Sequence, residues 1–141
     1  MQSIGKFELQ IFNDFSEFKV MNAWLQNVFK TLALPELLAK DLDVCVNEAV
    51  TNIILYAYED QKSHQIQMQI EFNENEEICL TIQDDGSPFD PFSAVLTDKY
   101  EKIDGLNIGG LGIPLMRSLT SQRHYRWVNG KNNTTLCFCL S

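Results

Sequence analysis

The sequence predicts a single α+β domain, residues 1–141, in which helices cover one face of a mostly antiparallel, mixed sheet. Three observations lead to this class. The chain has 141 residues, about one domain, and 45% of them are hydrophobic, which is enough to bury a core. Segments that alternate polar and apolar residues, as strands do, occur near both ends and in the middle. Two longer segments follow the helical period instead.

The first half of the chain is expected to form one strand and two helices. The segment KFELQIF alternates as a strand does. Asp14 then precedes Glu17 by three positions, the pattern of a helix N-terminal cap. That helix should run to about Leu34, because the residue before a proline disfavours helical backbone. Pro35 opens the second helix, which is expected to end near Tyr58.

The second half is expected to form two strand pairs around a loop region. HQIQMQIEF and EICLTIQ predict an antiparallel hairpin, and HYRWVN and TTLCFCL predict another around the turn GKNN. Asp90 and Pro91 predict the start of a short helix, and IPLMRSLT predicts a further one. Between them, residues 97–112 form a long loop of charges and glycines, and such loops tend to be functional. With so few helices, the other face of the sheet should meet water or a partner.

Composition and charge exclude several classes of protein. The net charge of −8 argues against binding bare nucleic acid. No run of about eighteen apolar residues predicts a membrane span, and no secretory signal is visible at the N-terminus. The four cysteines (Cys45, Cys79, Cys137 and Cys139) lack a CxxC spacing, and the last two point the same way on one strand. We therefore expect four reduced thiols in a cytoplasmic protein.

Glu48 and Asn52 place a carboxylate and an amide on one face of the second helix, beside its apolar stripe. There they can line a pocket between helix and sheet. A carboxylate in such a pocket can take a proton from a hydroxyl group, and an amide oxygen can bind Mg²⁺. The alternative is the solvated polar edge of an amphipathic helix.

The segment DDGSPFD, residues 84–90, follows the strand EICLTIQ. A carboxylate at a strand end, next to a glycine that allows close approach, can accept a hydrogen bond from an amino group such as that of adenine. The segment offers two such acids, Asp84 and Asp85, before Gly86. The alternative is an ordinary Asp-Gly turn.

The segment NIGGLGIPLMRS places three glycines before a helix whose first turn contains Pro114. Backbone N–H groups at a helix start make an anion site, and glycine lets phosphate approach the backbone. The spacing does not match a Walker loop, and the segment follows a loop, which excludes the Rossmann fingerprint. A flexible glycine hinge is the alternative.

In their order and spacing, the three motifs resemble the N, G1 and G2 boxes of the GHKL ATPase superfamily, which includes gyrase and the histidine kinases. NEAVTNIILYAYED, DDGSPFDP and GGLGIPLMRSL are most similar to the small anti-sigma-factor serine/threonine kinases of that superfamily. The resemblance covers nearly the whole chain and implies a Bergerat-type ATP-binding sandwich. The chain departs from the family at Tyr56, where histidine is common, but Tyr56 lies outside the catalytic pair.

The resemblance also implies roles for individual residues. Glu48 would be the general base, and Asn52 would bind Mg²⁺. The residues that would hold ATP are Asn52, Asp84, Gly86, Gly110, Leu111, Gly112 and Thr135. Among them, Asp84 would accept a hydrogen bond from the adenine amino group, and Thr135 would help to hold a water on the adenine side. Residues from about 100 to 109 would form the ATP lid.

By this resemblance the chain would be an ATP- and Mg²⁺-dependent serine/threonine-protein kinase and an anti-sigma-type regulator. It would phosphorylate a STAS-domain antagonist, sequester a sigma factor, or both, and a homodimer is left open. The alternative is a non-catalytic module that holds its partner according to ATP or ADP occupancy. Glu48 favours the kinase, because a binding module needs no base. A histidine kinase is disfavoured, since it needs a phosphoacceptor histidine on a separate helical hairpin. Neither nucleic acid nor a membrane is an expected partner.

Overall fold

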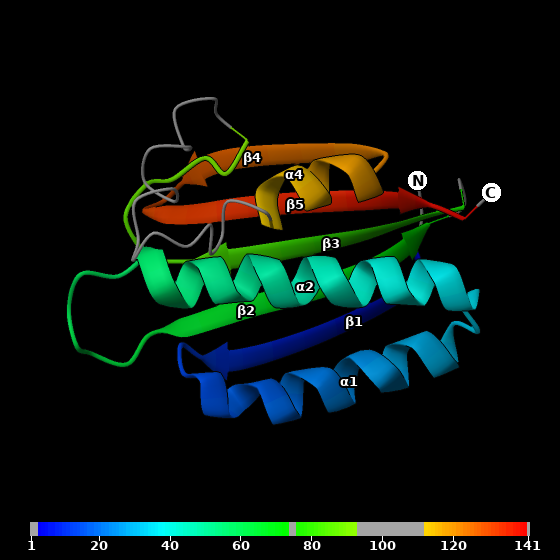
Figure 1. Cartoon of the computed structure of the whole chain (residues 1–141), viewed down its shortest axis with the longest axis horizontal. Coiled ribbons are helices and arrows are strands. Elements are labelled where there is room, and N and C mark those ends of the chain that lie inside the picture. Colours follow the sequence, from blue (N-terminus) through cyan, green and yellow to red (C-terminus); the bar gives the residue numbers. More distant parts are fainter. Residues whose placement is uncertain (1–2, 74–75, 93–111, 141) are drawn as a thin grey trace.

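The computed structural model describes residues 3–73, 76–92 and 112–140. Five strands form one sheet in the order β1-β2-β3-β5-β4, and α1, α2 and α4 cover one of its faces (Figure 1). This confirms the predicted α+β class with helices on one face. All four strand pairings within these residues are antiparallel, so the described sheet has no parallel pair that would make it mixed.

The helices and strands follow the predicted order. They are β1 (Ser3–Phe12), the 3₁₀ turn η1 (Phe15–Glu17), α1 (Phe18–Thr31), α2 (Glu36–Tyr56), β2 (Gln65–Asn73), β3 (Glu77–Asp84), α4 (Gly112–Leu119), β4 (Gln122–Val128) and β5 (Lys131–Cys139). Residues 91 and 92 form a turn, and the rest of the short helix expected after Asp90 lies outside the described residues.

Local backbone geometry explains where α1 begins and ends. Asp14 caps η1 by accepting a hydrogen bond from the Ser16 N–H, so the helix itself starts only at Phe18. The expected end at Leu34 is three residues too late. Ala33 adopts a left-handed φ of 50°, and the Leu34 N–H returns to the Phe29 carbonyl, a contact that closes a helix C-terminus.

The hydrophobic core lies between the sheet and the helices. The strands contribute every second residue to it: Ile66, Met68, Ile70, Ile78, Leu80, Ile82, Leu136 and Phe138. The alternate positions, such as Gln67, Thr81 and Asn133, lie on the opposite face, which no described helix covers. The expectation of one covered and one open face is therefore confirmed. In the described part of the chain, no helix is long and apolar enough to cross a membrane.

The turn between β4 and β5 sets which residues of β5 face the helices. It consists of Asn129 and Gly130, which have φ values of 54° and 74°. Both residue types tolerate positive φ, and the pair is typical of a tight β-hairpin turn. The predicted turn GKNN is therefore wrong in position, because Asn132 and Asn133 already belong to β5.

The expectation of four reduced thiols is wrong for one pair. Cys79 on β3 lies directly opposite Cys137 on β5, and the two form a disulfide across a Cα–Cα distance of 4.1 Å. The partners are 58 residues apart in sequence, so only the pairing of the two strands brings them together. Cys45 and Cys139 are free, and burial raises the pKa of the Cys45 thiol to about 12.

Candidate functional site

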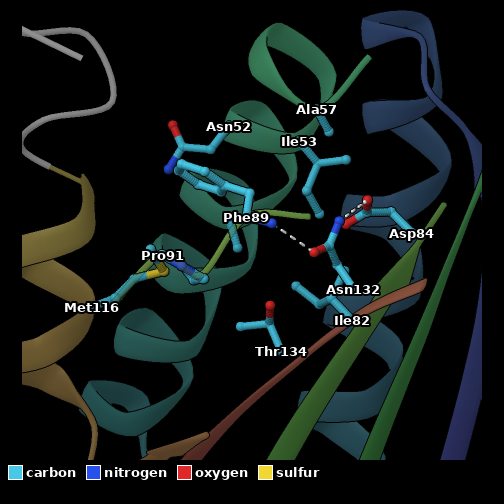
Figure 2. A pocket seen from close by; sticks show the side chains of 11 residues that line it. Asn52, Ile53, Ala57, Ile82, Asp84, Phe89, Pro91, Met116, Asn132 and Thr134 are labelled. Carbon is cyan, nitrogen blue, oxygen red and sulfur yellow. Dashed lines mark hydrogen bonds between the residues drawn. The ribbon is translucent and has the colours of Figure 1, made fainter. Parts of the chain in front are cut away.

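A pocket of about 40 Å³ lies between α2, the sheet and α4 (Figure 2). Most of its walls are apolar side chains, among them Ile53, Ile82 and Met116. Four polar side chains also line it: Asn52, Asp84, Asn132 and Thr134. An apolar pocket with a few convergent polar groups is the usual form of a small-molecule site.

Asn52 is a buried amide whose hydrogen-bonding groups are unused. Only 6% of the residue is exposed, and neither Oδ1 nor Nδ2 has a hydrogen-bond partner within the described residues. Leaving such a group unsatisfied costs about 1–3 kcal/mol, and native proteins rarely do so. Figure 2 shows Asn52 projecting from α2 into the region that Phe89 also lines. Its amide is therefore available to a ligand.

In the segment NEAVTN, Asn47 and Glu48 have different positions relative to the pocket. The Asn47 Nδ2 donates to Asn22 Oδ1 of α1 at 3.1 Å and to the Asp43 carbonyl at 2.8 Å, so Asn47 joins the two helices. Glu48 is half-buried and stands one turn before Asn52 on the same helix face. It is not among the residues that line the pocket, so its carboxylate flanks the site.

Asp84 is a buried carboxylate at the end of β3, with 4% of the residue exposed. Its Oδ1 accepts hydrogen bonds from the Gly86 N–H at 2.9 Å and from Asn132 Nδ2 at 3.0 Å. Burial raises the pKa of this carboxyl group, while these two hydrogen bonds act to lower it. Both donors in the described chain reach Oδ1, so Oδ2 is the oxygen that can accept a hydrogen bond from a ligand.

Gly86 allows the turn after Asp84 to pack against the end of α2. A Cβ at this position would lie 2.6 Å from both the Cβ and the carbonyl oxygen of Ala57. The adjacent Ser87 N–H donates to the same carbonyl at 2.9 Å. The glycine is therefore required for a close backbone contact that places Asp84 beside α2.

Thr134, and not Thr135, lines the pocket. The Thr135 hydroxyl lies 3.3 Å from Thr81 Oγ1, and both residues line a separate hollow on the open face of the sheet. The structure therefore does not bring Thr135 together with Asn52 and Asp84. Sequence reasoning missed Thr134 and Asn132. The pair Asn129–Gly130 was the available signal, because a two-residue turn there determines which face each residue of β5 occupies.

The glycine segment is described only from Gly112, where α4 begins. The expected phosphate contacts Gly110 and Leu111, like the expected lid, lie outside the described residues. Further along α4, Met116 lines the pocket. The Arg117 guanidinium donates a hydrogen bond to the Phe92 carbonyl, so α4 is tied to the segment that follows Asp84.

Comparison with known proteins agrees with this geometry. Residues 14–138 match the family model for a histidine kinase-like ATPase domain. The chain is 27% identical to the serine/threonine-protein kinase BtrW of Bordetella bronchiseptica, over 80% of this chain and 79% of that protein. It is 36% identical to the serine-protein kinase RsbW of Staphylococcus aureus, over 59% of this chain and 55% of that protein. It is 28% identical to the anti-sigma F factor of Clostridium novyi, over 58% of this chain and 57% of that protein.

The matched part thus spans little more than half the length of RsbW and the anti-sigma F factor. Among solved structures, the histidine kinase domain of the blue-light activated histidine kinase EL346 from Erythrobacter litoralis has a similar fold. The TM-score is 0.53 at 18% identity, over 73% of this chain and 45% of that one. Because the family model matches most of its length, this chain belongs to the histidine kinase-like ATPase domain family.

Proposed function

We propose that this protein is an ATP-dependent serine/threonine-protein kinase and an anti-sigma-type regulator that works in the cytoplasm. It phosphorylates a STAS-domain antagonist, sequesters a sigma factor, or both. The family and the names of the relatives support this proposal. The observation that carries it is the buried amide of Asn52, which has no hydrogen-bond partner among the described residues and lies in the same pocket as the buried carboxylate of Asp84.

The pocket suits the base of ATP in its chemistry. Asp84 Oδ2 can accept a hydrogen bond from the adenine amino group, and Ile53, Ile82 and Met116 offer apolar surface to the ring. The cavity of about 40 Å³ has room for roughly three waters, whereas ligand pockets measure about 300 Å³ or more. Binding of the base therefore requires the walls to move apart.

The donor set also fits Mg²⁺, which prefers oxygen ligands together with water and phosphate. Asn52 Oδ1 would hold the ion, and the bound ion would neutralise charge on the phosphates. Gly110, Leu111 and Gly112 stay the proposed phosphate contacts. Glu48, one turn before Asn52, would take the proton from the serine or threonine hydroxyl of the protein substrate.

The second candidate is a module that binds its partner according to ATP or ADP occupancy without phosphorylating it. Both candidates need Asp84 to bind the adenine base of ATP and Asn52 to bind Mg²⁺. Only the kinase needs a carboxylate at position 48, and Glu48 therefore favours it.

The deciding experiment mixes the purified protein, labelled ATP and the STAS-domain protein encoded by a neighbouring gene. Glu48→Gln should slow transfer of label by about two to four decades, because it removes the general base. ATP should still bind, because the proposed nucleotide contacts remain. Glu36→Gln, an exposed change at the start of the same helix, is the matched control and should transfer label normally.

Undiminished transfer by Glu48→Gln would exclude Glu48 as the base. Normal ATP binding with no label on the partner, but with an ATP-dependent complex, would establish the non-catalytic module.

A further inference from the structure

Asn132 is a buried amide whose hydrogen-bonding capacity is fully used. It lies on β5 opposite Asp84 of β3, and 3% of the residue is exposed. Its Nδ2 donates to Asp84 Oδ1 at 3.0 Å and to the Ser87 carbonyl at 2.9 Å. Its Oδ1 accepts from the Phe89 N–H at 2.9 Å and from the Tyr125 hydroxyl. Figure 2 shows the bonds to Asp84 and Phe89.

These partners permit only one orientation of the amide. The side that meets Asp84 and Ser87 faces two acceptors, and the Phe89 N–H on the other side can only donate. A reversed amide would place its oxygen against two oxygens. Asn132 is therefore held rigidly, and it joins three segments: the end of β3, the turn of residues 86–89, and β4 through Tyr125.

We propose that Asn132 is a positioning residue of the nucleotide site. It fixes the Asp84 carboxylate so that Oδ2 is left for the base, and it holds the turn that carries Phe89 at the pocket wall. This inference rests on the proposed function, because it names the residue that orients the group proposed to recognise adenine. Asn132 acts through Asp84 and needs no contact with the nucleotide.

The electrostatics around Asp84 make this role measurable. Burial raises the pKa of the Asp84 carboxyl group, and the donors Asn132 and Gly86 oppose that rise. Loss of the Asn132 donor should therefore raise this pKa further. Among the described residues, the other titratable groups that face the carboxylate or its neighbour are Asp85, Tyr58, Tyr125 and His64, which pairs with Asp85 at 3.2 Å.

Asn132→Asp tests the role with little change in size. It sets a second carboxyl group against Asp84, and two carboxyl groups at this distance share one proton. The singly protonated pair keeps a hydrogen bond in place of the amide, whereas the doubly ionised pair repels. The ratio of the variant's Kd for ATP to that of the wild type should therefore rise severalfold as pH rises through the titration of this pair.

The matched control is Asn133→Asp, one residue along the same strand and on its other face. Asn133 Oδ1 accepts from Gln83 Nε2 at 2.9 Å, a contact that a carboxylate preserves. Its Kd ratio should not vary with pH. Thermal unfolding of both variants without nucleotide, measured at each pH, tests whether they are folded. If Asn132→Asp does not fold, Asn132→Ser replaces it, because the serine side chain is too short to donate a hydrogen bond to Asp84.

A second measurement needs no nucleotide. Carboxyl ¹³C NMR follows the titration of Asp84 in the free wild-type protein and in Asn132→Ser, where the midpoint should move to higher pH. A Kd ratio that is independent of pH, or an unchanged Asp84 titration, would overturn the role of Asn132. A wild-type protein that does not bind ATP, with the Asp84 midpoint still raised in the variant, would overturn the proposed function and leave the positioning of Asp84 standing.

Discussion

The proposed recognition of the adenine base by Asp84 depends on one oxygen of its carboxylate. One carboxylate oxygen is occupied by the Gly86 N–H and the Asn132 amide, and the other can accept a hydrogen bond. An exocyclic amino group donates to that oxygen, whereas a carbonyl group repels it. ATP and GTP differ in this respect, so the selectivity between them reports on this one atom.

Asp84→Asn should weaken ATP binding by about one to two decades, because a hydrogen bond to a charged group contributes about 1.5–3 kcal/mol. Calorimetric titration measures the change. Asp85→Asn, at the exposed neighbouring carboxylate, is the control and should bind ATP almost as the wild type does. In the wild type GTP should bind poorly, and equal affinities for ATP and GTP would remove Asp84 from recognition of the base.

Between elements, the contact of Gly86 with the end of α2 determines where the turn of residues 86–89 lies. The atoms that a Cβ would meet at 2.6 Å include the backbone carbonyl of Ala57, which cannot rotate away as a long side chain could. The turn and the helix end would have to separate. That separation would also displace Asp84 from α2.

Gly86→Ala should therefore lower the free energy of unfolding by about 1–3 kcal/mol, the usual cost of overpacking. Denaturant unfolding measures this cost. At Gly5 a Cβ would meet only the Phe7 ring at 3.4 Å and Leu32 at 3.5 Å, which is near-ordinary contact, so Gly5→Ala is the control. Equal stability of the two variants would show that the turn has room to move.

The loop between α2 and β2 is held by a histidine between two carboxylates. His64 Nε2 lies 2.8 Å from Asp60 Oδ1, its Nδ1 lies 3.2 Å from Asp85 Oδ1, and its ring stacks on Tyr58 at 4.2 Å. The hydrogen bond to Asp60 is the largest cause that raises the pKa of His64 above its ordinary value of 6.5. The charged imidazole thus ties the loop to the turn that contains Asp85.

A raised histidine pKa contributes stability that is complete below the unfolded-state pKa and is lost as pH rises through the folded-state pKa. The free energy of unfolding should therefore fall as pH rises from about 6 through neutrality, and His64→Gln should reduce that slope. Denaturant unfolding at a series of pH values measures it. An unchanged slope in His64→Gln would exclude this histidine as its cause.

At the scale of the whole molecule, the sheet order brings the parts of the site together. The central strand β3 ends at Asp84, β5 runs beside it, and α2 and α4 pack against each other over this region of the sheet (Figure 1). Residues from four elements therefore meet at one pocket. A ligand in this pocket would contact all four elements, so its binding should stabilise the entire fold.

Mg-ATP at about 100 times its Kd should add about 2.7 kcal/mol to the free energy of unfolding. Asn52→Leu should remove this gain, because it deletes the proposed ion ligand. The same change should stabilise the free protein by about 1–3 kcal/mol, since it replaces a buried amide that has no partner among the described residues with an apolar side chain of similar shape. Thermal melts with and without Mg-ATP measure both effects. A variant less stable than the wild type would show that the amide is satisfied in solution.

Features that depend on neighbouring residues can be predicted from the amino-acid sequence alone. The periodicity of α2 and the alternation in β2 and β3 predicted these elements, because their side-chain spacing is local. Glu48 and Asn52 share a face because they are four positions apart in a helix. The acidic end of β3 and the start of α4 in the glycine segment could also be inferred in this way.

The distant residues that complete the pocket could not be predicted, because the pairing of the strands brings them together. Asn132 and Asp84 are 48 positions apart and meet because β5, and not β4, lies beside β3. The same pairing joins Cys79 to Cys137. Thr134 rather than Thr135 reaches the pocket because the turn at Asn129–Gly130 sets the register of β5, and a shift of one residue moves every side chain to the other face. Strand order and register depend on how the whole chain buries its core, which no local pattern specifies.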